Sequence, residues 1–145
     1  MNAELEYYAP CLFGLEGVLA GEARRLGFGS VRAENGSVTF TGPAMALAKA
    51  NLWLRTAERV NIVVGRFTAV TFDELFEGAK ALPWEDWIAK DDAFPVVGHS
   101  LKSKLHSVPD CQAIIKKAVA DRLGGRYGLS SKNTDPAQIK AVFDN

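Results

Sequence analysis

Several features are scarce or missing in this sequence, and each absence excludes a class of protein. The only two cysteines, Cys11 and Cys111, lie far apart and outside any Cys-x-x-Cys pair, which argues against a disulfide framework or a zinc site and predicts a reducing compartment. No apolar stretch approaches the ~20 residues that span a bilayer. The acidic start, residues 1–6, lacks the basic segment and apolar run of a secretory signal. We therefore expect a cytoplasmic protein without membrane contact.

Motifs of common catalytic sites are also missing. The chain has neither a Gly-x-Gly-x-x-Gly fingerprint nor a P-loop. Its six prolines are isolated, so the Asn/Asp-Pro-Pro-aromatic tetrapeptide with which some methyltransferases hold a target amino group does not occur. His99 and His106 have no neighbouring cysteine or paired carboxylate, which argues against a metal site. We expect no catalytic residue, no metal ligand and no cofactor site within these residues.

Charge is balanced overall but unevenly distributed. The chain contains 17 Lys+Arg and 17 Asp+Glu. Residues 1–95 have 9 basic against 13 acidic side chains, whereas residues 96–143 have 8 against 3, a net charge of +5. The second part is therefore the part expected to meet an anionic partner, although solvated lysine-rich helix faces would give the same count.

The first 67 residues alternate between strand and helix patterns. Asn35-Gly36 is a strong hairpin signal and favours a type I′ turn. The predicted elements are strands at 7–13, 31–34, 37–41 and 60–67 and helices at 15–26 and 43–55. The order β-α-β-β-α-β is that of a ferredoxin-like split βαβ fold with both helices on one face of an antiparallel sheet. Gly17 and Gly21, one turn apart, are expected to let the first helix approach its neighbours closely.

Residues 68–145 predict a second unit. Thr71 and Glu74 form a capping-box pattern at the start of a helix, and a short turn around Trp84 and Trp87 is expected to bury both rings. The predicted elements are helices at 71–81 and 107–123 and strands at 94–101 and 139–143. Gly124-Gly125 is expected to end the longer helix. Because the final strand has no later partner, we expect this unit to be truncated before its last strands.

Lysines, hydroxyl groups and one tyrosine gather in the basic part. In an extended strand, Ser100, Lys102 and Lys104 share one face, opposite Leu101 and Leu105. Lysines contact phosphates as point charges, hydroxyl groups add directional hydrogen bonds, and a tyrosine stacks on an unpaired base at ~1–3 kcal/mol. Ordinary surface lysines would explain each residue singly. The candidate nucleic-acid contacts are Ser100, Lys102, Ser103, Lys104, His106, Lys116, Lys117, Arg126, Tyr127 and Lys132.

Longer stretches of the sequence resemble one known family. The decapeptide from Asn51 to Val60, NLWLRTAERV, is similar to a signature near the end of the N-terminal ferredoxin-like module of bacterial ribosomal-RNA guanine-N2 methyltransferases, often labelled N6-adenine-specific DNA methylases. Phe76 to Glu85 and Phe94 to Gly128 look like the THUMP domain that follows. The resemblance covers essentially the whole chain and implies an α+β protein, with a ferredoxin-like module at 1–67 and a partial THUMP domain at 68–145.

The same resemblance implies a function. It suggests an RNA-binding, substrate-presenting region, with 23S ribosomal RNA as the partner. The S-adenosylmethionine and the active site would belong to a methyltransferase domain in cis beyond residue 145. Two alternatives stay open: a docking or dimerisation module, of this enzyme or of a DNA methylase, without nucleic-acid contact, and a stand-alone ferredoxin-like enzyme or ligand-binding domain.

Overall fold

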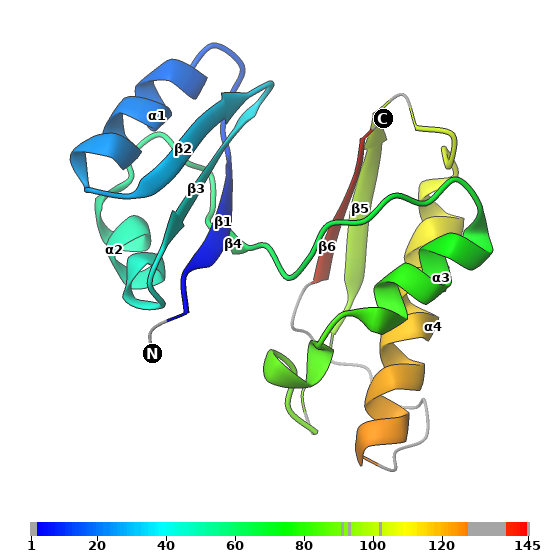
Figure 1. Cartoon of the computed structure of the whole chain (residues 1–145). Helices are drawn as coiled ribbons and strands as arrows, with labels where there is room; N and C mark the ends of the chain where they lie inside the picture. Colours follow the sequence, from blue (N-terminus) through cyan, green and yellow to red (C-terminus); the bar gives the residue numbers. More distant parts are fainter. Residues whose placement is uncertain (1–2, 91, 93, 102, 128–138, 145) are drawn as a thin grey trace. The chain divides into compact units, whose positions relative to one another are not determined.

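The computed structural model describes residues 3–90, 92, 94–101, 103–127 and 139–144 (Figure 1). The chain divides into two compact units, Met1–Val64 and Gly65–Asn145. The expected boundary after residue 67 stays a prediction. Within the described ranges, no helix is long and apolar enough to cross a membrane.

The first unit is a four-stranded sheet with two helices. Its elements are β1 (Leu5–Pro10), α1 (Glu16–Arg25), β2 (Gly29–Glu34), β3 (Ser37–Gly42), α2 (Met45–Trp53) and β4 (Asn61–Ile62). The strand order is β2-β3-β1-β4, and neighbouring strands are antiparallel. Figure 1 shows α1 and α2 on the same side of the sheet. The predicted ferredoxin-like arrangement is confirmed.

The core of this unit follows from strand alternation. Tyr7 and Phe40 are fully buried and face each other across β1 and β3, with ring centroids 5.3 Å apart. Phe28 stacks on Phe40 at 4.5 Å. Small residues of the helices, including Ala23 and Ala50, complete the buried cluster. Small helix residues over an aromatic sheet face allow the two layers to pack closely.

The hairpin between β2 and β3 forms where it is predicted, but its turn differs. Gly36 has a φ of +74°, whereas Asn35 does not have a positive φ, so the turn is not type I′. Tertiary contacts hold it instead. The Gly36 N–H donates to Glu16 Oε1 at 3.0 Å, and the Gly36 carbonyl accepts from the Cys11 N–H at 2.9 Å. Glu16 also accepts from the Gly14 N–H at 2.8 Å, and backbone donors, its own N–H first, lower the pKa of this carboxyl.

Other boundaries in the first unit also differ from the prediction. β1 ends at Pro10 instead of Phe13, and β4 has only two residues. α2 ends at Trp53 because Leu54 adopts an extended backbone (ψ 125°) and turns toward the core. The expectation for the helix glycines is wrong. A Cβ on Gly17 would meet open space, and one on Gly21 would meet only the Arg25 side chain of the same helix.

The second unit packs two helices beside a parallel strand pair. Its elements are α3 (Phe72–Ala81), a 3₁₀ turn η1 (Trp84–Asp86), β5 (Val96–Leu101), α4 (Val108–Tyr127) and β6 (Ile139–Asp144). α3 and α4 lie side by side in Figure 1, and they contact each other extensively. β6 pairs with β5 from Val96↔Ile139 to Leu101↔Asp144, so the predicted last strand has an earlier strand as its partner.

Of two local predictions in this unit, the capping box is confirmed and the burial of both tryptophans is corrected. The capping box is present: the Glu74 N–H donates to Thr71 Oγ1, and the Thr71 N–H donates to Glu74 Oε2, both at 3.2 Å. Only one tryptophan of the following turn is buried. Trp84 Nε1 donates to the Ala79 carbonyl at 2.6 Å, whereas Trp87 remains 39% exposed.

Gly124-Gly125 does not end α4, which continues to Tyr127. Neither glycine adopts the positive φ of a helix-ending cap. Two helical glycines cost about 1 kcal/mol each relative to alanine. The packing of the preceding turns compensates, because Val119 and Leu123 are buried. The predicted helix end is therefore wrong, because tertiary contacts outweigh the low helix propensity of the two glycines.

Candidate nucleic-acid interface

The first part of the candidate interface is the loop between β5 and α4. β5 ends at Leu101, so the predicted single strand face through Lys104 does not form. The loop is fixed by Leu105, which is 7% exposed. Its carbonyl accepts from Ser100 Oγ at 3.2 Å and from Cys111 Sγ at 3.9 Å, and its N–H donates to Ser103 Oγ at 3.2 Å. The predicted hydroxyls of Ser100 and Ser103 thus hold the loop in place.

The buried Leu105 leaves its two neighbours on the surface. Lys104 and His106 are both exposed. His106 Nδ1 lies 3.3 Å from the Lys104 carbonyl oxygen, within reach of an N–H donor. The loop therefore has both side chains on its surface. The candidate Lys102 between β5 and this loop lies outside the described residues.

The second part of the interface is the exposed side of α4. Lys116 and Lys117 are both exposed on this helix. At ~1.5 Å per residue, Lys116 lies about 12 Å along the axis from the first helical residue, Val108. The two lysines are thus separate from Lys104 and His106, and one ligand group could not touch both places.

The predicted positions after the helix are only partly within the structure. Arg126 and Tyr127 belong to the last turn of α4, not to a following loop, because the helix passes through the glycine pair. Lys132 lies outside the described residues. The structure therefore brings the backbone of two candidates onto the same helix as Lys116, while the loop prediction for them is wrong.

Phe76, Lys80 and Lys117 form an aromatic–lysine cluster on α3 and α4 that was not predicted from the sequence. Lys80 Nζ lies 5.5 Å and Lys117 Nζ 5.8 Å from the centre of the Phe76 ring, so one ring faces two ammonium groups. Phe76 and Lys80 are four residues apart on α3, which is a spacing that places side chains together on a helix. That spacing was the available signal.

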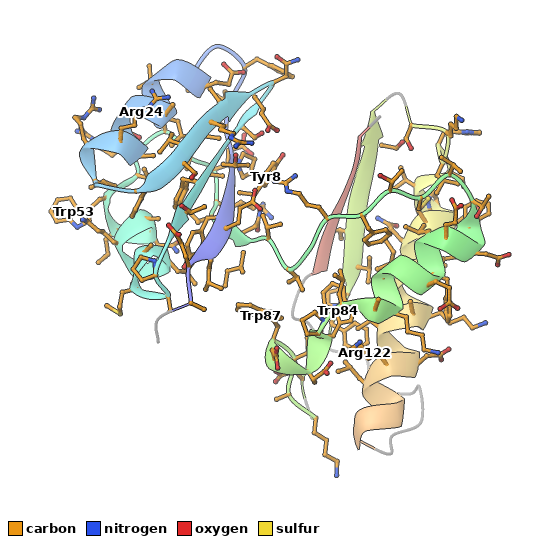
Figure 2. All side chains as sticks on the ribbon, in the orientation of Figure 1. Tyr8, Arg24, Trp53, Trp84, Trp87 and Arg122 are labelled. Carbon is orange, nitrogen blue, oxygen red and sulfur yellow. The ribbon has the colours of Figure 1, made fainter. Side chains whose placement is uncertain are left out.

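Arg122 of α4 is a structural cation. Its Nε donates to Glu85 Oε2 and its Nη2 to Glu85 Oε1, both at 2.7 Å. Its Nη1 donates to the Lys80 carbonyl at 2.9 Å. The hydrogen bond to Glu85 is the main cause that raises the pKa of Arg122. Figure 2 shows Arg122 beside Trp84, so this fork joins α4 to the end of α3 and to η1.

A second charged site lies in the first unit. Glu22 of α1 is buried, and its Oε2 accepts from Thr56 Oγ1 at 2.9 Å, from the Arg55 N–H at 3.2 Å and from the Thr56 N–H at 3.3 Å. Arg55 Nε lies 3.6 Å from Glu22 Oε1. Burial raises the pKa of Glu22, but these donors and the charge of Arg55 outweigh it and lower the pKa overall. Part of the NLWLRTAERV segment thus serves to bind a carboxylate.

Among the residues that the structure describes, no three His, Cys, Asp or Glu side chains gather as a metal site. Burial raises the pKa of both thiols, Cys11 and Cys111, which disfavours a reactive thiolate. The arrangement offers cations and aromatic rings for binding an anionic polymer.

Comparisons with family models match both units. Residues 6–61 match the RlmL ferredoxin-like domain, and residues 69–137 match the THUMP domain. The chain belongs to these two domain families. It therefore joins a ferredoxin-like domain of the RlmL kind to a THUMP domain, as the resemblance of the sequence implied.

Similar proteins share this domain pair. The chain is 52% identical over 118 residues to a Bacillus subtilis protein provisionally named RNA methyltransferase YpsC, and 33% identical over 138 residues to ribosomal RNA large subunit methyltransferase K/L of Pseudomonas putida. These matches cover 81% and 94% of this chain but only 30% and 19% of the relatives. The chain thus spans less than a third of either relative.

Solved structures agree on the fold. A Listeria monocytogenes protein described as a predicted N6-adenine-specific DNA methylase superimposes with a TM-score of 0.87 at 48% identity, covering 98% of this chain and 37% of that one. SMU.472, described as a methyltransferase in complex with SAH, gives a TM-score of 0.84 at 39% identity, covering 99% and 39%. The THUMP unit and the ferredoxin-like unit are therefore both present in larger proteins named as methylases.

Proposed function

We propose that this chain is the RNA-binding, substrate-presenting region of an S-adenosylmethionine-dependent ribosomal RNA methyltransferase that modifies guanine N2, with 23S ribosomal RNA as substrate. The observation that supports it most directly is the loop at the start of α4, where Lys104 and His106 are both exposed, in the unit that matches the THUMP model. Lys116 and Lys117 extend this cationic surface along the helix. Lysines at separate points along the loop and the helix suit a polymer that carries many phosphates.

A separate binding region has a physical reason in such an enzyme. A methyltransferase pocket receives a single base that has been turned out of its stack. Selection of one site in a large RNA then depends on contacts elsewhere, which an RNA-binding domain supplies through shape and phosphates. We assign S-adenosylmethionine to a catalytic domain in cis, in keeping with SMU.472, which is described in complex with SAH and of which this chain covers 39%.

The test is an RNA titration of charge-reversed variants. The double variant Lys104→Glu, Lys116→Glu is compared with Lys90→Glu, an exposed lysine of the same unit outside the candidate surface. Structured ribosomal RNA fragments should bind the double variant more weakly. The slope of log affinity against log salt should fall in magnitude by about 1 for each phosphate that the variant no longer binds. Equal weakening by Lys90→Glu would indicate a non-specific charge effect and contradict the assignment.

The same titration separates the competing roles. A docking or dimerisation module without nucleic-acid contact predicts that neither double variant nor control changes RNA affinity in a longer protein that contains the catalytic domain. A DNA methylase predicts that duplex DNA competes with ribosomal RNA at equal concentration. We expect the RNA to remain bound, because the relatives named for ribosomal RNA include the domain order of this chain.

A further inference from the structure

The ferredoxin-like unit has a hollow that its own side chains do not fill. The hollow encloses about 450 Å³, within the ~300–1,000 Å³ range of small-ligand pockets. It lies where the C-terminal ends of α1 and α2 come together. Its lining residues are Glu22, Arg25, Leu26, Leu52, Trp53 and Arg55.

Trp53 is the most unusual member of this lining. It is the last residue of α2, and 64% of its surface is exposed. Figure 2 shows its side chain pointing outward. The neighbouring Leu52 is exposed as well. The adjacent Leu54 turns into the core, whereas the Trp53 indole stays in solvent at the hollow. The indole therefore offers a flat apolar face to a ligand.

The hollow is cationic although a carboxylate lies in it. Glu22 Oε2 already accepts three hydrogen bonds from Arg55 and Thr56, so this charge is compensated. The Arg55 side chain itself is 86% exposed and reaches Glu22 only at 3.6 Å. Lys49 Nζ donates to the Leu26 carbonyl at 2.7 Å, which offsets the partial negative charge at the end of α1. An anionic ligand is therefore not repelled.

We propose that this hollow binds one unpaired nucleotide of the RNA, with its base stacked on Trp53 and its phosphate held by Arg25 and Arg55. Aromatic side chains stack any base, and guanidinium groups bind phosphate through paired N–H donors. A protein partner fits less well, because a stable interface takes ~20–30 residues a side and six residues line this hollow. The inference rests on the proposed RNA-binding function and adds a single-strand contact on the other unit.

The experiment compares two labelled RNAs by fluorescence anisotropy with the 145-residue chain. One is a single-stranded hexamer of adenylates, and the other is a blunt hairpin with a minimal loop. Trp53→Ala should weaken binding of the hexamer by between about 5-fold and about 150-fold, the range for loss of one base stack. The double variant Arg25→Ala, Arg55→Ala should also weaken it, because it removes both proposed phosphate contacts. Binding of the hairpin should change by less than about twofold.

Matched controls exist on the same unit. Phe13→Ala removes another exposed aromatic ring, and Arg32→Ala removes another exposed arginine; both should leave the hexamer affinity unchanged. Trp53→Tyr keeps a stacking ring and should recover most of the affinity. Circular dichroism melts check that each variant keeps the fold. We expect that it does, because Thr56 Oγ1 and the backbone N–H groups of Arg55 and Thr56 still bind Glu22, and only the 3.6 Å contact of the Arg55 side chain is lost in the double variant.

The outcomes separate this inference from the proposed function. If the wild-type chain binds neither RNA, the proposed function itself is wrong. If Lys104→Glu weakens RNA binding and Trp53→Ala changes the hexamer affinity by less than about twofold, the proposed function stands and the nucleotide site is refuted. The same result is expected if the hollow is a docking surface for a protein and not a nucleotide site.

Discussion

The hydroxyl of Thr56 is expected to stabilise the first unit by binding the buried carboxylate of Glu22. Thr56→Val removes one donor from Glu22 Oε2, at 2.9 Å, and preserves the branched shape of the side chain. A hydrogen bond to a charged group contributes about 1.5–3 kcal/mol. Since two backbone N–H groups still bind the carboxylate, we expect the lower end, about 1.5 kcal/mol, in the free energy of unfolding. Urea denaturation at neutral pH measures this loss.

A matched control and a pH series make this prediction stringent. Thr41 Oγ1 donates to Glu4 Oε1 at 2.8 Å, but at an exposed position, so Thr41→Val should cost less than about 0.5 kcal/mol. The folded pKa of Glu22 is lowered, so its stabilising contribution is present above the unfolded pKa of ~4.3 and disappears as pH falls through the folded pKa. The deficit of Thr56→Val should therefore shrink in acid. Equal losses in the two variants, or a deficit that grows in acid, would refute the reasoning.

Three further changes test the second unit. Thr71→Ala removes the N-cap of α3 and should cost about 1 kcal/mol, measured by urea denaturation, whereas Thr68→Ala outside the helix should not; equal costs would contradict the cap. Arg122→Lys loses the paired hydrogen bonds to Glu85 and should speed hydrogen exchange in α4. Unchanged exchange would contradict a stabilising role for these bonds. Trp84→Phe leaves the Ala79 carbonyl without its indole donor and should cost about 1–3 kcal/mol; a neutral result in thermal unfolding would contradict that bond.

Patterns within one element predicted the structure well. The helix predicted at 15–26 and the Thr71–Glu74 capping box depend on neighbours a few residues away, and both are present, the first as α1 and the second at the start of α3. Features fixed by distant residues were missed. The turn at Gly36 depends on Glu16, which lies in another element, and the length of α4 depends on its packing against α3.

The candidate site shows the same limit. The sequence located the basic segment and placed Leu105 opposite Lys104, but it could not show that β5 ends at Leu101, so that Lys104 belongs to the loop and not to the strand. Nor could spacing alone show that two lysines from different helices meet one ring, Phe76. Residue type indicates which partner a surface suits, whereas only tertiary contacts decide which side chains reach it.

The segment that follows α2 illustrates how fold and binding are combined in one stretch. Because Leu54 leaves the helix in an extended conformation, successive side chains alternate in direction. Leu54 packs on the core and Thr56 binds the buried Glu22, whereas Trp53 and Arg55 remain on the surface at the hollow. Arg55 takes part in both tasks, since its backbone N–H holds Glu22 while its side chain stays exposed. The same few residues therefore fix the end of α1 against α2 and position the indole and guanidinium groups that we assign to RNA.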